Sequence, residues 1–263
     1  MHVFDRDISV TELEQNQFLG KVTDNWSING IPNGGYLMAI GAQAMLLSSG
    51  KKSTPVITAN YISRCIPGEA QILVEEFSRS KQFNRFQVKL IQDGKEKIRM
   101  HGTFADEKIE CSVERYETKT PDIAPLDKCI QLPAIPQFTL MNHLDIRLDP
   151  VSAGWMQGKL TDTSEMRGWI KFRDKRPFDI QSVLLAADAF PPPVFASHGM
   201  SAWVPTIELS VNVRNIPVTA WLKGAFRTRF ITCGLLESDG ELWDEKGNLV
   251  AISRQIAQFK KPA

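Results

Sequence analysis

Cysteine and histidine are scarce in this 263-residue chain, which has four of each. The histidines show neither metal-ligand spacing nor a Ser-His-Asp arrangement. The cysteines lie far apart, without metal-ligand or redox spacing, and we expect reduced thiols at Cys65, Cys111, Cys129 and Cys233. This scarcity argues against a disulfide scaffold, a metal centre and a serine hydrolase.

An excess of charge of one sign is also missing, as are long apolar runs. The 31 Lys and Arg against 30 Asp and Glu leave a formal net charge of +1, which gives no electrostatic reason to bind nucleic acid or an anionic membrane. No basic stretch followed by an apolar run opens the chain, and no segment reaches the roughly 20 apolar residues of a membrane span. We therefore expect a cytoplasmic protein without a signal peptide, integral membrane association or nucleic-acid partner.

What the chain does have is ample core material, with 43% hydrophobic residues, and one segment that dominates its first half. Residues 33 to 47, NGGYLMAIGAQAMLL, carry no formal charge, and their large apolar side chains spread around a full helical turn. This pattern predicts a helix that is buried on every side. Asn33 is its expected N-cap, and Gly34 and Gly35 would let another group approach its first N–H donors.

Strands are predicted around this helix. Alternating apolar residues favour strands at 18–26, 56–64, 70–79, 83–92 and 96–104, with a hairpin turn at Asp93–Gly94. Four prolines between residues 117 and 140 exclude a regular element there, so we predict a surface linker. The expected organisation is an N-terminal repeat over residues 1–116, a linker over 117–140 and a C-terminal repeat over 141–263.

The second half repeats the first. Residues 178 to 190, FDIQSVLLAADAF, predict another apolar helix that ends before three prolines, and strands are expected at 206–214, 221–230, 233–243 and 249–259. Turns are expected at Asp239–Gly240 and Lys246–Gly247. A shift of 150 positions aligns five identical residues within thirteen, from Pro55 and Pro205 onward. The chain is therefore expected to be a duplicated α+β unit, a helix followed by an antiparallel sheet.

These patterns together resemble a known family. The helix opening NGGYLMA, the run WVPTIELSVNVR and the run ELWDEKGNLVAISRQ are similar to the thioesterase-like superfamily related to acyl-CoA thioesterase II. The resemblance covers nearly the whole chain and implies a double hotdog fold, in which each sheet wraps around a long buried helix. It also implies an acyl-CoA thioesterase that hydrolyses its substrate to a free acid and coenzyme A, needs no metal or organic cofactor and forms homo-oligomers.

The family uses an Asp, a Thr and a Gln on second-half strands, and the resemblance places Glu208, Thr228 and Gln255 at these positions. Glu208 is then expected to activate water, with Thr228 and Gln255 as hydrogen-bond partners of the carboxylate or the water. At the 150-residue shift Glu208 faces Thr58, so only the second half has a carboxylate there. Glutamate stands where the family has aspartate, and its extra methylene displaces the carboxylate.

Each of these residues also has a structural interpretation. Glu208 is interpretable as a solvated residue on the polar face of its strand, Thr228 as a strand former with Thr232 as its substitute, and Gln255 as a cap of a sheet edge. The amides of Gly34 and Gly35 are candidates to polarise the thioester carbonyl, although paired glycines most often mark close helix packing.

Asp188 is a second candidate base. It lies in the apolar segment 178–190, where a buried charge needs a partner such as a nearby arginine. Two other functions fit a hotdog fold: an acyl-CoA or lipid-binding module without catalysis, and an enoyl-CoA hydratase. The hydratase would need an Asp-x-x-x-x-His arrangement after a strand, and the chain has none.

Overall fold

The computed structural model describes residues 1–106, 113 and 115–260. Within them, fourteen strands form one antiparallel sheet, and β3 (Ser27–Ile28) pairs with β4 (Ile31–Pro32) separately. The strands of the large sheet are β1 (Val10–Glu14), β2 (Gln17–Val22), β5 (Ser53–Tyr61), β6 (Gly68–Arg79), β7 (Phe83–Gln92), β8 (Lys95–Ala105), β9 (Ile130–Gln131), β10 (Leu144–Leu148), β11 (Ser164–Phe172), β12 (Thr206–Val213), β13 (Leu222–Thr228), β14 (Ile231–Thr232), β15 (Leu235–Asp244) and β16 (Leu249–Gln258).

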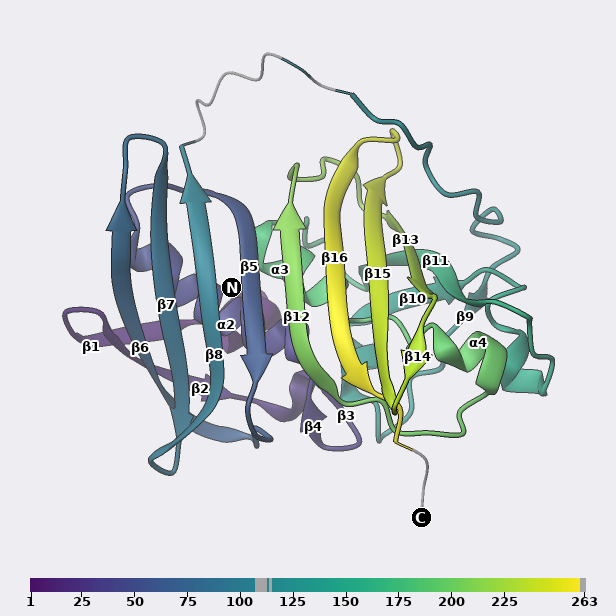
Figure 1. Cartoon of the computed structure of the whole chain (residues 1–263), viewed down its shortest axis with the longest axis horizontal. Helices are drawn as coiled ribbons and strands as arrows, with labels where there is room; N and C mark the ends of the chain where they lie inside the picture. Colours follow the sequence, from purple (N-terminus) through teal and green to yellow (C-terminus); the bar gives the residue numbers. More distant parts are fainter. Residues whose placement is uncertain (107–112, 114, 261–263) are drawn as a thin grey trace.

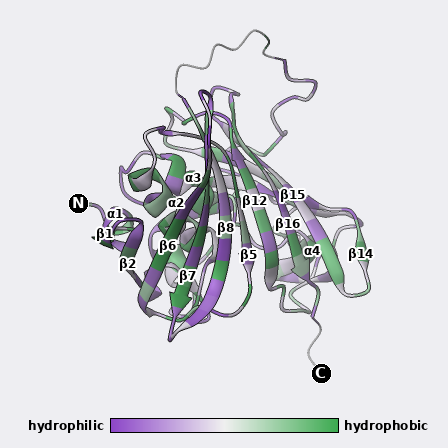
Figure 2. Ribbon diagram, turned by 60° about the vertical axis from the view of Figure 1, so that its left-hand side comes forward, coloured by the Kyte–Doolittle hydropathy of each residue, from purple (hydrophilic) through white to green (hydrophobic). Residues whose placement is uncertain are grey.

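The helices of the described chain lie mainly on one side of this sheet (Figures 1 and 2). They are α1 (Val3–Asp7), α2 (Gly34–Ser48), α3 (Ile180–Ala186) and α4 (Val194–His198), with short 3₁₀ turns at Asp24–Trp26, Thr139–Asn142 and Gly154–Gln157. Within the part of the chain that the structure describes, no helix is long and apolar enough to cross a membrane.

Helix α2 is the buried helix that its sequence predicts. The side chain of Asn33 caps it by accepting a 3.0 Å hydrogen bond from the Tyr36 amide. Buried residues occur all around the helix, and Tyr36, Met38 and Ile40 are at most 1% exposed. The helix is apolar on every side because it contacts the sheet of the first half and packs against α3.

The second helix is shorter than its apolar segment suggests. Asp179 caps α3 through a capping box with Ser182, and the helix ends at Ala186. The amide of Asp188 then bonds to the Leu185 carbonyl, and that of Ala189 to the Ala186 carbonyl, so the chain leaves the α-helix in tight turns before the prolines at 191–193. Of the helix expected over residues 178–190, only residues 180–186 are therefore α-helical.

The sheet shows the duplication directly. Outward from its centre the strand order is β5, β8, β7, β6, β2 and β1 on one side, and β12, β16, β15, β13, β11, β10 and β9 on the other. Strands β5 and β12 pair antiparallel at the centre, where Thr58 faces Ser210 and Asn60 faces Glu208 (Figure 1). The two repeats thus share one continuous sheet, and the pseudo-twofold axis passes between β5 and β12.

Most predicted strand boundaries lie within a few residues of the observed ones, but one turn is misplaced. Asp93 and Gly94 both have positive φ, as a two-residue hairpin requires, and Gly247 also lies in a turn. Asp239 and Gly240 instead lie inside β15, and the tight turn before that strand is made by Cys233 and Gly234.

Of the cysteines expected to be thiols, Cys65, Cys129 and Cys233 form no disulfide, and Cys111 lies outside the described residues.

The proline-rich segment, expected as a surface linker, contacts the second repeat. The carbonyl of Asp122 accepts from Arg167, and that of Ala124 accepts from the Trp169 indole, both on β11. The segment also contains β9, which pairs with β10. It therefore crosses the side of the sheet that faces away from the helices, whereas the exact boundaries of the repeats stay a prediction.

Candidate active site

The start of α2 meets the end of α3 at a carboxylate. The amide of Gly35 donates to Asp188 Oδ2 at 3.0 Å, and Asn33 Nδ2 donates to the same oxygen at 3.0 Å and to the Asp188 carbonyl at 2.8 Å. Glycine is required at position 35, because a Cβ there would lie 2.5 Å from the Leu184 carbonyl oxygen. The N-terminus of α2 therefore holds a carboxylate from the other repeat.

Asp188 has no positively charged partner in the described part of the chain. It forms no ion pair with any residue that the structure describes, contrary to the expected arginine, and its oxygens accept only from neutral N–H groups. Besides the bonds at Oδ2, Gln255 Nε2 donates to Oδ1 at 2.9 Å. Burial raises the pKa of Asp188 to about 6, and the hydrogen bonds from Gly35, Gln255, Gly34 and Asn33 oppose this rise. The carboxylate is thus ionised at neutral pH but more basic than an ordinary aspartate.

Gln255 joins Asp188 to a hydroxyl group. Its Nε2 also donates to Thr206 Oγ1 at 2.6 Å, so the two hydrogens of this amide hold a carboxylate on one side and a threonine on the other. Gln255 comes from β16 and Thr206 from the first position of β12. An Asp, a Thr and a Gln are therefore gathered at one place, the three residue types that the family resemblance implies.

A β-bulge brings Thr206 to this side of the sheet. Thr206 pairs with Ala257 and Leu209 pairs with Gln255, with one extra residue of β12 in between. Cross-strand partners share a face, so this irregularity puts Thr206 on the same face as Leu209 and Gln255, the face that packs against the helices. Strict alternation would have placed Thr206 on the opposite face, together with Glu208.

Glu208 lies on the other face of the sheet. Its cross-strand partners are Ile256 on β16 and Asn60 on β5, whereas the neighbouring pair Leu209 and Gln255 points toward the helices. In the described chain no hydrogen bond or ion pair joins the Glu208 side chain to Asp188, Thr206 or Gln255. The alternation predicted for this strand is confirmed, because its burial pattern alternates from Glu208 to Val213.

Thr228 lies on the inner face but at a distance from Gln255. It ends β13, which is separated from β16 by β15, so about 10 Å or two strand spacings lie between the two residues. Its hydroxyl is buried and has no hydrogen-bond partner among the described residues. Of the residues predicted for the site, the structure brings Gly34, Gly35 and Gln255 to Asp188, and leaves Glu208 and Thr228 outside this group.

Two residues of the site were not predicted from the sequence. Thr206 is one, and no sequence pattern marks the bulge that turns it inward. The other is Tyr61, the last residue of β5. A Cβ built on Gly34 would lie 2.8 Å from the Tyr61 hydroxyl oxygen and 2.9 Å from Asp188 Oδ2, so both groups border the start of α2. Asp188, by contrast, could be recognised from the sequence, because it is a carboxylate in an apolar segment.

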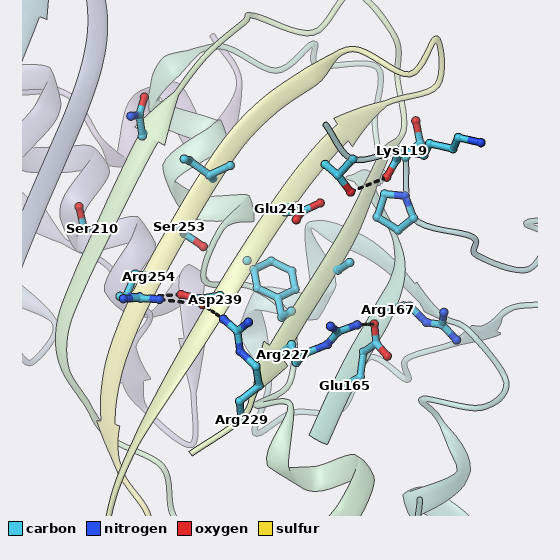
Figure 3. A pocket seen from close by; sticks show the side chains of 18 of the residues that line it. Lys119, Glu165, Arg167, Ser210, Arg227, Arg229, Asp239, Glu241, Ser253 and Arg254 are labelled. Atoms are coloured by element: carbon cyan, nitrogen blue, oxygen red, sulfur yellow. Dashed lines mark hydrogen bonds and ion pairs between the residues drawn. The ribbon is translucent and has the colours of Figure 1, made fainter. Parts of the chain in front are cut away.

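A cavity of about 810 Å³ lies on the opposite, outer face of the second repeat (Figure 3). Several of its charged groups pair with one another: Arg254 donates to Asp239 at 2.6 and 2.8 Å, and Arg227 to Glu165 at 3.0 Å. None of Asp188, Thr206, Gln255 and Tyr61 lines it. The candidate site around Asp188 therefore lies on the helix side of the sheet and not in this cavity.

Comparison with known proteins agrees with this architecture. A protein of Thermobifida fusca YX described as a candidate thioesterase II superposes with a TM-score of 0.90 at 24% identity, covering 99% of this chain and 98% of that one. A hotdog-fold protein of unknown function from Alicyclobacillus acidocaldarius gives 0.89 at 21% identity, with both chains fully covered. The acyl-CoA thioesterase II TesB2 of Mycobacterium marinum gives 0.80 at 17% identity, covering 99% of each chain. These likenesses confirm the double hotdog fold.

Models of protein-family sequences identify the family of this chain. No curated protein sequence matches this chain. The model of the acyl-CoA thioesterase N-terminal domain matches residues 22–105, and the model of the acyl-CoA thioesterase C-terminal domain matches residues 119–259. Because the second model alone spans more than half of the 263 residues, the chain belongs to the acyl-CoA thioesterase family.

Proposed function

We propose that this protein hydrolyses acyl-CoA to a carboxylic acid and coenzyme A, with Asp188 as the general base at a single site per chain. The observation that carries the proposal is the Asp188 carboxylate, which is partly buried and is held by Gln255 beside the Thr206 hydroxyl. Among the described residues it has no cationic partner. Asp188 and Thr206 replace Glu208 and Thr228 in this proposal, and Gln255 keeps the role predicted for it.

The proposed water molecule is held by the base and the threonine. Asp188 Oδ1 accepts one protein hydrogen bond, from Gln255, so it keeps a lone pair for a water proton. Thr206 Oγ1 accepts from the same nitrogen, which leaves the hydroxyl hydrogen free to hold that water. The attacking oxygen is thereby oriented by two groups that Gln255 fixes relative to one another.

The proposed hydrolysis consumes one water molecule, whose oxygen goes to the acid and one of whose protons goes to the thiol. The water oxygen attacks the thioester carbon while Asp188 takes its proton, and the carbonyl π electrons move to the carbonyl oxygen. When the tetrahedral intermediate collapses, the C=O bond forms again, the C–S bond breaks and the sulfur leaves with the proton from Asp188. The amides of Gly34 and Gly35 hold Asp188 in the resting state, so we assign them to orienting the base in place of the carbonyl role expected from the sequence.

The direct test is release of thiol from a panel of acyl-CoAs. In Asp188→Asn the base is lost while the shape of the side chain is kept, and we expect kcat to fall about 10²–10⁴-fold. Glu208→Gln is the matched control on the other face of the sheet, and its kcat should stay within about threefold of the parent value. If Glu208→Gln loses activity while Asp188→Asn retains it, Glu208 is the base and the assignment of Asp188 is wrong.

The same panel separates the other two functions. Binding of acyl-CoA without thiol release by the parent protein would identify a binding module. Addition of water to an enoyl-CoA without thiol release would identify a hydratase. The expected cytoplasmic location and homo-oligomeric state stay predictions, and neither enters the catalytic proposal.

A further inference from the structure

The Tyr61 hydroxyl is a buried donor without a partner. Its oxygen is shielded from solvent, and it forms no hydrogen bond to any residue that the structure describes. Buried tyrosine hydroxyls usually have a partner, because leaving one unpaired costs about 1–3 kcal/mol. An unpaired buried hydroxyl beside the proposed catalytic carboxylate indicates that an atom of a bound ligand accepts its hydrogen bond.

The position of Tyr61 is set by the junction of the two repeats. Ile57, Ala59 and Tyr61 alternate onto the helix-facing side of β5, and the first two are fully buried. Pairing with β12 extends to Asn60 and Glu208, so Tyr61 stands just beyond the last paired residue, at the start of α2. Its hydroxyl therefore points to the region between Gly34 and Asp188.

The other donors at the site are already engaged. The Gly35 amide and Asn33 Nδ2 donate to Asp188, and Gln255 uses its amide hydrogens for Asp188 and Thr206. Thr206 keeps one hydrogen, which the proposed mechanism uses for water. Among the described residues around Asp188, Tyr61 thus supplies the donor that remains for the second reactive atom, the carbonyl oxygen.

We propose that Tyr61 is a catalytic residue that donates its hydroxyl hydrogen to the thioester carbonyl oxygen. This inference rests on the proposed function and adds the electrophilic half of the site. As water attacks, the carbonyl π electrons move onto that oxygen, and the Tyr61 hydrogen bond strengthens with the developing negative charge. The phenol keeps its proton throughout, and the bond weakens again when the C=O bond forms and the C–S bond breaks.

The ionisation of Tyr61 suits this role. Burial, with the negative charge of Asp188 as a second cause, raises the pKa of the phenol well above its ordinary value. The hydroxyl therefore keeps its proton at neutral pH, where Asp188 is ionised. One repeat then supplies the group that polarises the carbonyl, and the other supplies the group that activates water.

Tyr61→Phe removes only the unpartnered oxygen. We expect kcat for acyl-CoA hydrolysis to fall about 10²–10³-fold, the usual effect of losing one oxyanion donor. KM should change by less than about threefold, and the melting temperature should not fall, because no protein hydrogen bond is lost. The acidic limb of the pH profile should stay where the parent protein has it. A shifted limb would mean that Tyr61 acts through Asp188 and would overturn the proposal, as would an unchanged kcat.

A binding measurement tests the carbonyl contact without turnover. A 2-oxoalkyl-CoA keeps the carbonyl but replaces the scissile thioester by a ketone, and the alkyl-CoA thioether of equal length lacks the carbonyl. The parent protein should prefer the ketone about tenfold, the worth of one hydrogen bond, and Tyr61→Phe should bind both equally. A parent protein without this preference, or a variant that keeps it, would overturn the proposal. If the preference is present but no thiol is released from any acyl-CoA, the proposed hydrolysis fails and the Tyr61 contact stands.

Discussion

Asp188 shows how a single carboxylate can be partly buried and still ionise. An arginine partner would neutralise it and lower its pKa, which would make it a poor base. Here four neutral donors support the charge, from Gly34, Gly35, Asn33 and Gln255, and burial still prevails in setting the pKa at about 6. The residue is therefore basic enough to accept a proton from water and is mostly deprotonated at pH 7.

This pKa predicts the pH dependence of hydrolysis. A general base must be deprotonated, so kcat/KM should rise as pH increases through about 6 and level off above pH 7. The measurement is kcat/KM for acyl-CoA between pH 4.5 and 8, with Glu208→Gln as a variant that should give the same curve. A midpoint near the ordinary carboxyl value of about 4 would contradict the assignment of Asp188.

The same shift acts against the stability of the fold at neutral pH. The folded state binds the Asp188 proton more tightly than the unfolded chain does, because its pKa is raised from 3.8 to about 6. This contribution to stability is present below pH 3.8 and is lost as the pH rises through about 6. It amounts to at most about 3 kcal/mol, since each pKa unit corresponds to 1.36 kcal/mol. The proposed site keeps an ionised carboxylate at the expense of stability, as active sites often do.

At the scale of elements, the contact between α2 and α3 positions this base. Gly35 is packed against the backbone of α3, and its amide reaches Asp188 only because no side chain separates the two helices. The bulge in β12 has the same importance for Thr206, which it turns to the inner face. Two local backbone features, a glycine and a bulge, thus decide which side chains meet.

Gly35→Ala tests this packing. Its Cβ would lie 2.5 Å from the Leu184 carbonyl oxygen, so the helices must separate, and we expect a loss of about 1–3 kcal/mol in the free energy of unfolding. Thermal unfolding measures the change, and acyl-CoA hydrolysis should fall with it because Asp188 loses its contact to the amide. Gly50→Ala is the control, since nothing lies within 4 Å of its Cβ. Equal melting temperatures for the two variants would contradict close helix packing at Gly35.

At the scale of the whole molecule, the two repeats form one structural unit. Strands β5 and β12 join their sheets, α2 packs against α3, and a single hydrophobic core contains residues of both halves. The proposed site requires both repeats. Asn33, Gly35 and Tyr61 come from the first half, and Asp188, Thr206 and Gln255 come from the second. Catalysis is therefore expected only when both repeats are folded together.

This union predicts one cooperative unfolding transition. Val88→Ala and Leu242→Ala, each in the core of a different repeat, should both lower the urea midpoint of the same transition. The leucine variant should lose about 2–5 kcal/mol in the free energy of unfolding. Circular dichroism and tryptophan fluorescence should report coincident curves. Two separate transitions, with each variant shifting only one of them, would show that the repeats unfold independently.

The sequence by itself determined the local elements and their repetition. The uncharged run from Asn33 to Leu47, the Asp93–Gly94 turn and the 150-residue shift fix a helix, a hairpin and a duplicated unit, because caps, turns and alternation act over a few residues. The apolar composition of residues 178–190 marked Asp188 and the glycine-rich helix start marked Gly34 and Gly35, whereas Gln255 became a candidate only through the family resemblance.

Only the tertiary structure decided which residues meet. The contact between Gly35 and Asp188 joins positions 153 residues apart, and no local pattern encodes it. Glu208 and Thr206 are two residues apart on one strand and face opposite sides of the sheet, since a bulge at Ile207 reverses the alternation between them. The physical reason is that strand register and helix packing are set by the whole core, while alternation along a strand determines faces only where the pairing is regular.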